Sequence, residues 1–264
     1  MPDGVILVDK EAGVTSHDIV ARVRRAMGRG VKVGHAGTLD PFATGLLLVL
    51  VGRGTRVQRW LMGLPKSYET VARLGHTSTT GDVEGDIAPG QVPPEPFNLP
   101  TGRIRQRPPA YSAVKIGGRR AYALARAGEV VETREREVEV SRFDLLHREA
   151  DRATFAIECS SGTYVRSLVM DLGDAYCLEL RRSAIGSFRV EDADPERVVP
   201  LLEALAFLPR VVLEGADARR AGHGVAVPGE AAGATVALVD DGGLIALAEP
   251  REGGLLKPVV GFRG

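Results

Sequence analysis

The sequence predicts an α+β protein with a central mixed or antiparallel sheet, followed by a small β-barrel-like module at the C-terminal end. Short apolar, strand-like runs interleave with helix-like segments, but without the regular strand–helix–strand period of a doubly wound sheet. After residue 209 the composition changes to a stretch rich in Gly, Ala and Val with short β-like runs. We therefore expect one domain over residues 1–209 and a small module over residues 210–264.

The first 50 residues contain the clearest signals for individual elements. Residues 5–8 are apolar and predict a buried strand. Thr15 and Asp18 form a capping-box pair before a helical apolar period that stops at Gly28. The run 46–51 is rich in Leu and Val and predicts a second buried strand. Further strands are expected over residues 67–74, 130–146, 153–159 and 180–190, and helices over 54–63, 119–127, 163–176 and 200–208.

The composition is that of an ordinary soluble globular chain. The chain has 264 residues, of which 44% are hydrophobic and 26% charged, and 34 basic residues balance 34 acidic ones. The two cysteines and five scattered histidines show neither a disulfide framework nor a metal-ligand spacing. No apolar run is long enough for a membrane span, and the N-terminus lacks a signal-peptide core. We expect a cytoplasmic protein without a metal site.

Two segments are strongly basic although the total charge is zero. Residues 22–59 contain a single acid, Asp40, and residues 101–126 contain none. The balancing acids are concentrated in residues 69–95 and 129–151. Two such basic segments can combine into one face that attracts phosphate, so the neutral total does not exclude a nucleic-acid partner.

Asp40 is the residue best placed for chemistry. The chain has no phosphate loop, dinucleotide fingerprint, nucleophile elbow or metal-binding motif, so ATP, NAD and metal chemistry have no support. Pro41 disfavours a helical conformation at Asp40. A carboxylate in this position acts either as a nucleophile or general base, or as a helix cap or half of a structural ion pair. To stay ionised in a desolvated pocket it needs a cation, which lowers its pKa. Before any family is considered, the residues around Asp40 favour a structural role, either as a helix cap or in an ion pair.

Seven segments resemble, in order, the motifs of the TruB family, the bacterial tRNA pseudouridine synthases that modify uridine 55 in the TΨC arm. They are VDKEAGVTS (8–16), HAGTLDPFATGLL (35–47), KSYETVARLG (66–75), PPAYSAVK (108–115), RAYALARAG (120–128), CSSGTYVR (159–166) and LRRSAIGSF (180–188). Glu11 stands where the family usually has proline, and the segment 174–179 is shorter than usual. The tail resembles the PUA module that ends these enzymes.

The resemblance implies the pseudouridine-synthase fold with a C-terminal PUA-type RNA-binding module, and an isomerase that flips a uridine of tRNA out of its stack. Asp40 would be the nucleophile or base, and Arg166 would pair with it and keep it charged. Tyr68 would stack on the uracil. A C–N bond is exchanged for a C–C bond on the same base, so no cofactor is expected.

The resemblance also implies residues that bind the substrate. His35 would fill the gap left by the flipped base, and Leu180 would line the base pocket. Tyr164 would hydrogen-bond near the Asp40–Arg166 pair. The remaining residues expected to bind substrate are Lys66, Arg119 and Arg120, the last two in an RNA-gripping insertion of about residues 103–128. Without the resemblance, each has an ordinary core or surface role.

We expect a monomer that acts on tRNA without a membrane or a small-molecule cofactor. Two alternatives remain open from the sequence. One is the guide-RNA-dependent relative found in archaea and eukaryotes. The other is a non-catalytic protein that binds or folds tRNA.

Overall fold

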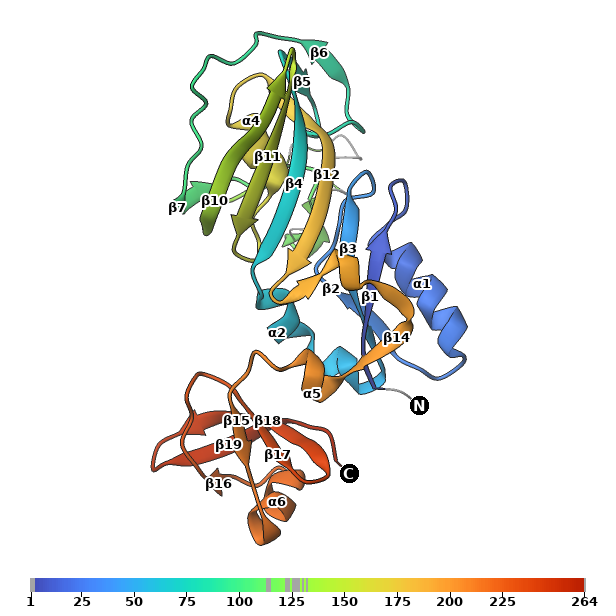
Figure 1. Cartoon of the computed structure of the whole chain (residues 1–264), viewed down its shortest axis with the longest axis vertical. Coiled ribbons are helices and arrows are strands. Elements are labelled where there is room, and N and C mark those ends of the chain that lie inside the picture. The colour runs from blue at the N-terminus through green and yellow to red at the C-terminus, as the bar shows by residue number, and fades with distance from the viewer. Residues whose placement is uncertain are drawn as a thin grey trace.

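The structure is a computed structural model that describes residues 3–112, 115–121, 124, 129, 131 and 133–263. It contains a large twisted sheet, which fills the upper and middle part of Figure 1, and a smaller sheet at the C-terminal end below it. The predicted α+β fold with a separate C-terminal sheet is confirmed. None of the helices in the described ranges is long and apolar enough to cross a membrane.

The large sheet has ten strands in the order β14-β1-β3-β12-β4-β11-β10-β7, with β2 paired to β3 and β13 paired to β12. Its strands are β1 (Gly4–Lys10), β2 (Val33–Ala36), β3 (Thr44–Val51), β4 (Lys66–Leu74), β7 (Gly102–Gln106), β10 (Arg136–Glu149), β11 (Arg152–Cys159), β12 (Ala175–Ile185), β13 (Phe188–Arg189) and β14 (Asp194–Pro200). Two hairpins lie outside it, β5 (His76–Ser78) with β6 (Ile87–Pro89) and β8 (Lys115–Ile116) with β9 (Arg119–Arg120).

The helices are short apart from the first one. They are α1 (Ser16–Met27), α2 (Gln58–Gly63), α4 (Val165–Met170), α5 (Leu201–Ala204) and α6 (Gly215–Gly222), with 3-10 turns at Gly52–Val57 and Val190–Asp192. The capping box predicted for α1 is confirmed, because Asp18 N donates to Thr15 Oγ1 at 3.1 Å and Thr15 N donates to Asp18 Oδ2 at 2.8 Å.

Strand β3 lies in the core of the protein because both of its faces are covered. Leu46, Leu48 and Leu50 belong to an apolar cluster that continues into the C-terminal sheet. Their neighbours Leu47 and Val49 pack in a second cluster with the apolar face of α1. Burying a side chain of this size contributes about 1.5–3 kcal/mol. The strand thus anchors the turn before it, which carries Asp40.

The large sheet is mixed because β3 and β12 run parallel while the other pairings in it are antiparallel. At this parallel contact Gly45 lies opposite Arg182. Gly45 has φ +102°, and a Cβ atom there would lie 2.2 Å from the carbonyl oxygen of Arg182. Only glycine allows the two strands to approach this closely.

The C-terminal sheet has the strand order β15-β17-β18-β19-β16. Its strands are β15 (Arg210–Val212), β16 (Val227–Pro228), β17 (Val236–Asp240), β18 (Gly243–Arg251) and β19 (Leu255–Gly261). The curled sheet fits a PUA-like module. It packs directly on the large domain, since Leu247 and Phe262 share the apolar cluster of β3 and Trp60 Nε1 donates to Thr235 Oγ1 at 3.1 Å.

Two predicted helices have other bounds. Within 119–127, Arg119 and Arg120 lie in the strand β9, Ala121 and Leu124 are helical, and the other residues fall outside the described ranges. The helix expected over 163–176 is only Val165–Met170, and β12 already begins at Ala175. Asp174 ends the connection, because its backbone oxygen accepts from Gly75 N at 2.8 Å and its carboxylate accepts from Gln91 N at 2.8 Å. These bonds fix the short 174–179 segment at the corner after β4.

We predict that Gly45→Ala lowers the free energy of unfolding by clearly more than Gly30→Ala. Both glycines have a positive φ, but a Cβ at Gly30 would meet nothing within 4 Å. The control therefore measures backbone strain alone, about 1 kcal/mol, whereas Gly45→Ala also drives a methyl group into the backbone of β12. Urea denaturation of both variants checks the difference, and equal losses would contradict the close approach.

Candidate active site

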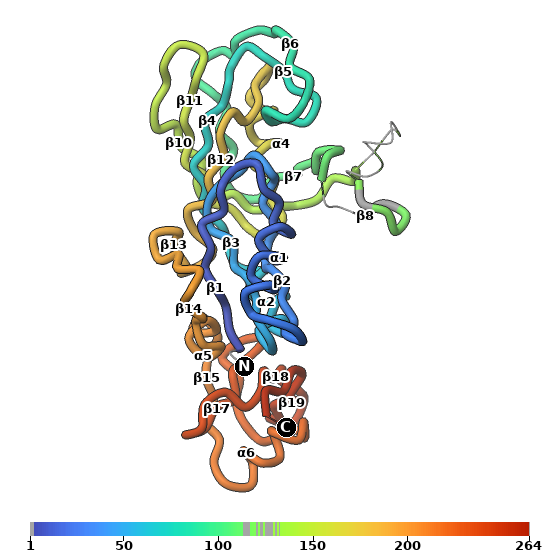
Figure 2. Tube along the Cα trace, turned by 90° about the vertical axis from the view of Figure 1, so that its right-hand side faces the viewer, coloured from blue at the N-terminus to red at the C-terminus, as the bar shows by residue number. Residues whose placement is uncertain are grey.

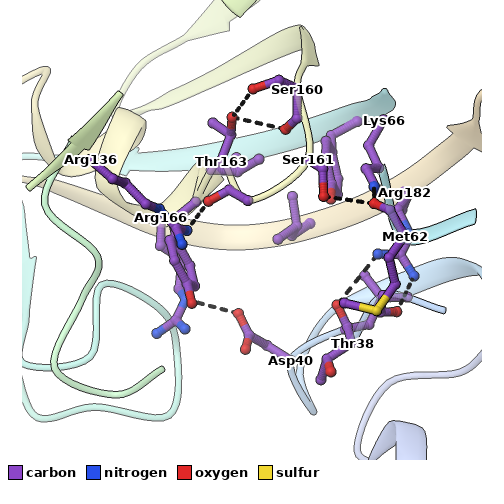
Figure 3. A pocket seen from close by; sticks show the side chains of 17 residues that line it. Thr38, Asp40, Met62, Lys66, Arg136, Ser160, Ser161, Thr163, Arg166 and Arg182 are labelled. Atoms are coloured by element: carbon purple, nitrogen blue, oxygen red, sulfur yellow. Dashed lines mark hydrogen bonds and ion pairs between the residues drawn. The ribbon is translucent and has the colours of Figure 1, made fainter. Parts of the chain in front are cut away.

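A cavity of about 240 Å³ opens where the turn before β3, the strands β4 and β12 and the start of α4 meet, and we call it the Asp40 cavity (Figure 3). Six of the residues predicted for the site line it: Asp40, Lys66, Tyr68, Tyr164, Arg166 and Leu180. They come from segments that are far apart in the sequence, and the mixed sheet brings them together.

Asp40 lies in a turn that is held from two sides. The backbone N–H of Ala43 donates to Asp40 O at 3.1 Å. From behind, the fully buried Lys10 donates its Nζ to the carbonyl of Pro41 at 3.1 Å and to that of Val14 at 2.9 Å. The Asp40 side chain is 33% exposed at the wall of the cavity, and its Oδ2 lies 2.9 Å from Arg166 Nε. The expected ion pair with Arg166 therefore forms.

The Arg166 side chain is almost completely buried and bridges two carboxylates. Its Nη1 lies 3.0 Å from Asp82 Oδ2 and also donates to Thr80 O at 2.7 Å, and its Nη2 donates to Tyr111 O at 2.8 Å. An uncompensated charge at such depth is strongly unfavourable, and removing one partner of a buried pair typically costs about 3–5 kcal/mol. The two carboxylates and two carbonyls thus fix the guanidinium beside Asp40.

The pKa of Asp40 is set by opposing effects of burial and charge. Burial of the carboxylate raises the pKa above its ordinary value, and this effect outweighs Arg166, which acts to lower it. The negative charge of Asp82 also raises it. The prediction named the desolvation and the cation, and Arg166 does act to lower the pKa, but the prediction did not include the second acid. The consequence is a carboxylate that is more basic than one in water.

Asp82 is a site residue that the sequence did not indicate. It is 2% exposed and lies in the loop between β5 and β6. The sequence of this loop is rich in Gly, Asp and Thr, so each of its acids is expected to be an ordinary turn residue. Thr80 Oγ1 and the backbone N–H of Glu84 both donate to its Oδ1. No local signal distinguishes this acid, because its partner Arg166 is distant in the sequence.

Arg182 and Tyr68 form the opposite wall of the cavity. They face each other across the antiparallel pair β12–β4. Arg182 is 1% exposed and donates Nε to Leu46 O at 2.8 Å and Nη2 to Gly37 O at 3.0 Å. The sequence assigned Arg182 to a motif but not to the site.

Lys66 is buried at the same wall and donates its Nζ to two carbonyls before β4, those of Met62 and Leu64. Burial lowers its pKa to about 8, and the nearby charge of Arg182 acts in the same direction. These contacts tie the end of α2 to the start of β4.

Tyr164 is placed by two residues that the sequence analysis missed. Gln106 is 2% exposed, and its amide group bonds both backbone groups of Tyr164, at 2.7 Å and 2.9 Å. The guanidinium of Arg136 lies over the Tyr164 ring, 4.8 Å from the ring centre. Arg136 also lines the Asp40 cavity. In the sequence, Gln106 and Arg136 have the pattern of ordinary strand residues. Nothing marks them as site residues, because Tyr164, which they contact, lies far along the chain.

Three predicted substrate-binding residues are not brought into the Asp40 cavity. His35 lines a neighbouring cavity of about 390 Å³, where its ring meets the ring of His17 edge to face at 5.4 Å. Arg119 lies on the β8–β9 hairpin, and its Nη1 is 2.8 Å from Glu129 Oε1. The side chain of Arg120 falls outside the described residues.

The basic segment 101–126 contains arginines that already pair with acids, which its composition does not show. Several of its arginines pair with acids from the stretch that follows, in the pairs Arg103–Glu137, Arg107–Glu135 and Arg119–Glu129. All these side chains are exposed, so each pair contributes only about 0–1 kcal/mol and exchanges readily for another anion.

The fold occurs in solved structures. A chain of the structure "Crystal Structure of a Cbf5-Nop10-Gar1 Complex" matches with a TM-score of 0.72 and 27% identity over 98% of this chain and 84% of that chain. A chain of an H/ACA RNP bound to a substrate RNA containing 2'-deoxyuridine has the same fold, with a TM-score of 0.72 and 23% identity over 99% of this chain and 85% of that one. This chain therefore shares its fold with a chain of each of these two complexes.

The family follows from sequence comparison. Residues 24–165 match the family described as TruB family pseudouridylate synthase (N terminal domain). The chain is 43% identical to tRNA pseudouridine synthase B of Thermobifida fusca, with 100% of both chains covered. It is 40% identical to tRNA pseudouridine synthase B of Mycobacterium tuberculosis (strain H37Rv), over 92% of this chain and 91% of that protein. The chain belongs to the TruB family, which confirms the predicted resemblance and enzyme class.

The buried Lys66 predicts a rise in stability with pH. The pKa of Lys66 is about 8 in the folded protein and about 10.4 in an unfolded chain. The unfolded chain therefore holds more protons above pH 8, and the free energy of unfolding should rise by about 1 kcal/mol from pH 7 to pH 9 through this group. Chemical denaturation at both pH values should show this increment in the wild type and not in Lys66→Met.

Lys32→Met serves as the control for this comparison, because Lys32 is an exposed lysine. It should keep the pH dependence of the wild type. An unchanged dependence in Lys66→Met would show that the ammonium group of Lys66 is not desolvated.

Proposed function

We propose that the protein converts uridine 55 in the TΨC arm of tRNA to pseudouridine without a guide RNA, with Asp40 as nucleophile or base. The observation that carries the proposal is the carboxylate of Asp40 at the wall of a cavity, with its Oδ2 held 2.9 Å from the buried guanidinium of Arg166. The full-length similarity to proteins named tRNA pseudouridine synthase B supports tRNA as the substrate.

The reaction needs only groups that this chain contains. The bond between C1′ and N1 of the uridine breaks, a bond between C1′ and C5 forms, and the hydrogen at C5 is exchanged for one at N1. No electrons are gained or lost overall. One carboxylate beside a cation is sufficient to stabilise the separated ribose or to add to the ring.

The contacts of Asp40 suggest which of its oxygen atoms reacts. Arg166 engages Oδ2, and no hydrogen-bond partner of Oδ1 occurs among the described residues. We therefore assign the reactive role to Oδ1, and the structure is compatible with attack on the ribose or on the ring. The raised pKa of Asp40 favours both, because a more basic carboxylate is the better nucleophile and base.

The flipped uracil would lie between the residues that line the Asp40 cavity. Tyr68 from β4 would stack on the ring, and Leu180 from β12 would contact its other side. Tyr164 and Lys66 would complete the wall. We place His35 in the space that the base leaves in the RNA, consistent with its position in the neighbouring cavity.

The RNA outside the cavity would be held by two further parts of the chain. The β8–β9 hairpin projects from the side of the molecule in Figure 2, and we assign residues 103–128, with Arg119 and Arg120, to an RNA-gripping insertion. Arg119 would exchange Glu129 for a phosphate. We also propose that residues 1–209 form the catalytic domain and residues 210–264 a PUA-type RNA-binding module.

The alternatives from the sequence are a guide-RNA-dependent enzyme and a protein that binds or folds tRNA without catalysis. The observation in favour of the first is that this chain shares its fold with a chain of the Cbf5-Nop10-Gar1 complex. Full-length similarity to tRNA pseudouridine synthase B favours the stand-alone enzyme. The monomeric state and the cytoplasmic location stay predictions.

We predict that Asp40→Asn abolishes pseudouridine formation, with a loss of at least about 10³-fold in the single-turnover rate, because an amide is neither nucleophile nor base. Binding of the tRNA, measured by filter retention, should stay within a few-fold of the wild type, which separates the enzyme from a mere binding protein. Asp86→Asn, which changes an exposed acid of the β5–β6 loop, should retain full activity. Isomerisation by Asp40→Asn would disprove the role of Asp40.

A further inference from the structure

Arg136 is the cation of the Asp40 cavity that an incoming anion can reach. The charged residues that line this cavity are one acid and four cations: Asp40, Lys66, Arg136, Arg166 and Arg182. The side chains of Lys66, Arg166 and Arg182 are buried, and their donors bond carbonyls or carboxylates of the protein. Arg136 is partly exposed. Figure 3 shows it on the same side of the cavity as Arg166 and across from Arg182.

Arg136 has no acidic partner in the part of the chain that the structure describes, although its two neighbours are acids. Glu135 pairs with Arg107, and Glu137 pairs with Arg103. Successive side chains of a strand point to opposite faces, so the side chain of Glu137 in β10 points away from that of Arg136. The charge of Arg136 is therefore not neutralised by any described carboxylate.

The Arg136 guanidinium is held in place while some of its donors stay unused. It lies over the Tyr164 ring, with Cζ 4.8 Å from the ring centre, and its Nη2 donates to Gly162 O. Its Nε and Nη1 donate to no acceptor among the described residues. A planar guanidinium that is fixed on one face by an aromatic ring is suited to bind a phosphate in a defined orientation.

The turn beside Arg136 offers further donors. A Cβ atom at Gly162 would lie 3.6 Å from Arg136 Cζ, so this turn is in direct contact with the guanidinium. The backbone N–H groups of Ser161 and Gly162 have no acceptor within the described ranges, and both residues line the cavity. Consecutive backbone N–H groups next to a cation are a common arrangement at anion-binding sites.

The substrate brings an anion to this place. A nucleotide whose base enters the Asp40 cavity carries one phosphate on the 5′ side and one on the 3′ side of its ribose. The negative charge of Asp40 repels such a phosphate, and a cation in the same cavity offsets the repulsion.

We propose that Arg136 binds a phosphate that flanks the target uridine and so positions the ribose of that nucleotide against Asp40. The inference rests on the proposed function. The contact does not depend on the base, so it places the nucleotide and does not select uridine.

The salt dependence of tRNA binding gives the first test. Arg136→Met should weaken binding about tenfold at low salt and reduce the slope of log Kd against log[salt] by about one, because one phosphate contact is lost. The Kd of unmodified tRNA is measured by filter retention over a range of salt concentrations. If Arg136→Met does not fold, Arg136→Gln takes its place, since it also removes the charge.

A neutral phosphate analogue gives the sharper test, because it identifies the group that Arg136 binds. The RNAs are TΨC stem-loops in which an uncharged methylphosphonate replaces the phosphate on the 5′ or on the 3′ side of the target uridine. The ribose before that position is 2′-O-methylated in each modified RNA and in its unmodified reference, because a free 2′-hydroxyl would cleave the methylphosphonate.

The expected result is a loss that depends on Arg136. At one of the two positions the wild type should bind the methylphosphonate RNA about tenfold more weakly than the reference, whereas Arg136→Met should bind the two RNAs equally to within about twofold.

Arg197 supplies a matched control. Arg197 is exposed, pairs with Glu203 at 2.9 Å, and lies in β14, the edge strand remote from β10. Arg197→Met should keep the salt slope of the wild type and its full sensitivity to the methylphosphonate.

The outcomes separate the inference from the proposed function. A coupling of at least about fivefold between Arg136 and one of the two phosphates supports the inference. If the wild type is active and the losses multiply to within about twofold at both positions, Arg136 only holds Tyr164 in place and the inference alone fails. If the wild type forms no pseudouridine in tRNA, the proposed function fails and the inference fails with it.

Discussion

The site depends on one buried guanidinium held between two carboxylates. Arg166 lies between Asp40 and Asp82 and also binds the carbonyls of Thr80 and Tyr111. These four partners come from the turn before β3, the β5–β6 loop and the segment that leads into β8. The buried charge of Arg166 must be paired, and its partners therefore hold three separate loops against the first turn of α4. The position of the reactive carboxylate follows from this requirement.

The sheet supplies the second constraint. The parallel contact of β3 with β12 brings the Asp40 turn next to Tyr68, because β12 also pairs with β4. The contact is possible only with glycine at position 45. Two arginines then hold the same turn from opposite sides, Arg166 at the carboxylate and Arg182 at the carbonyls before it. We regard this two-sided hold as the basis of a preorganised site.

The sequence predicted what is local or carried by a motif. The capping of α1 at Thr15, the buried strand β3 and the pairing of Asp40 with Arg166 were all expected and are present. Asp82 and Gln106 were not expected, since each is defined by a partner far along the chain and has no distinguishing neighbours. The net rise in the pKa of Asp40 could not be derived from the sequence, because the degree to which a carboxylate is buried is a tertiary property.

The central claim is that this chain alone isomerises one uridine of tRNA. It is tested most directly by incubating the purified protein with an unmodified tRNA transcript, without any other RNA, and mapping pseudouridine along the product. The account predicts pseudouridine at position 55 and at no other uridine. Absence of pseudouridine, or its appearance only after a guide RNA is added, would contradict the account.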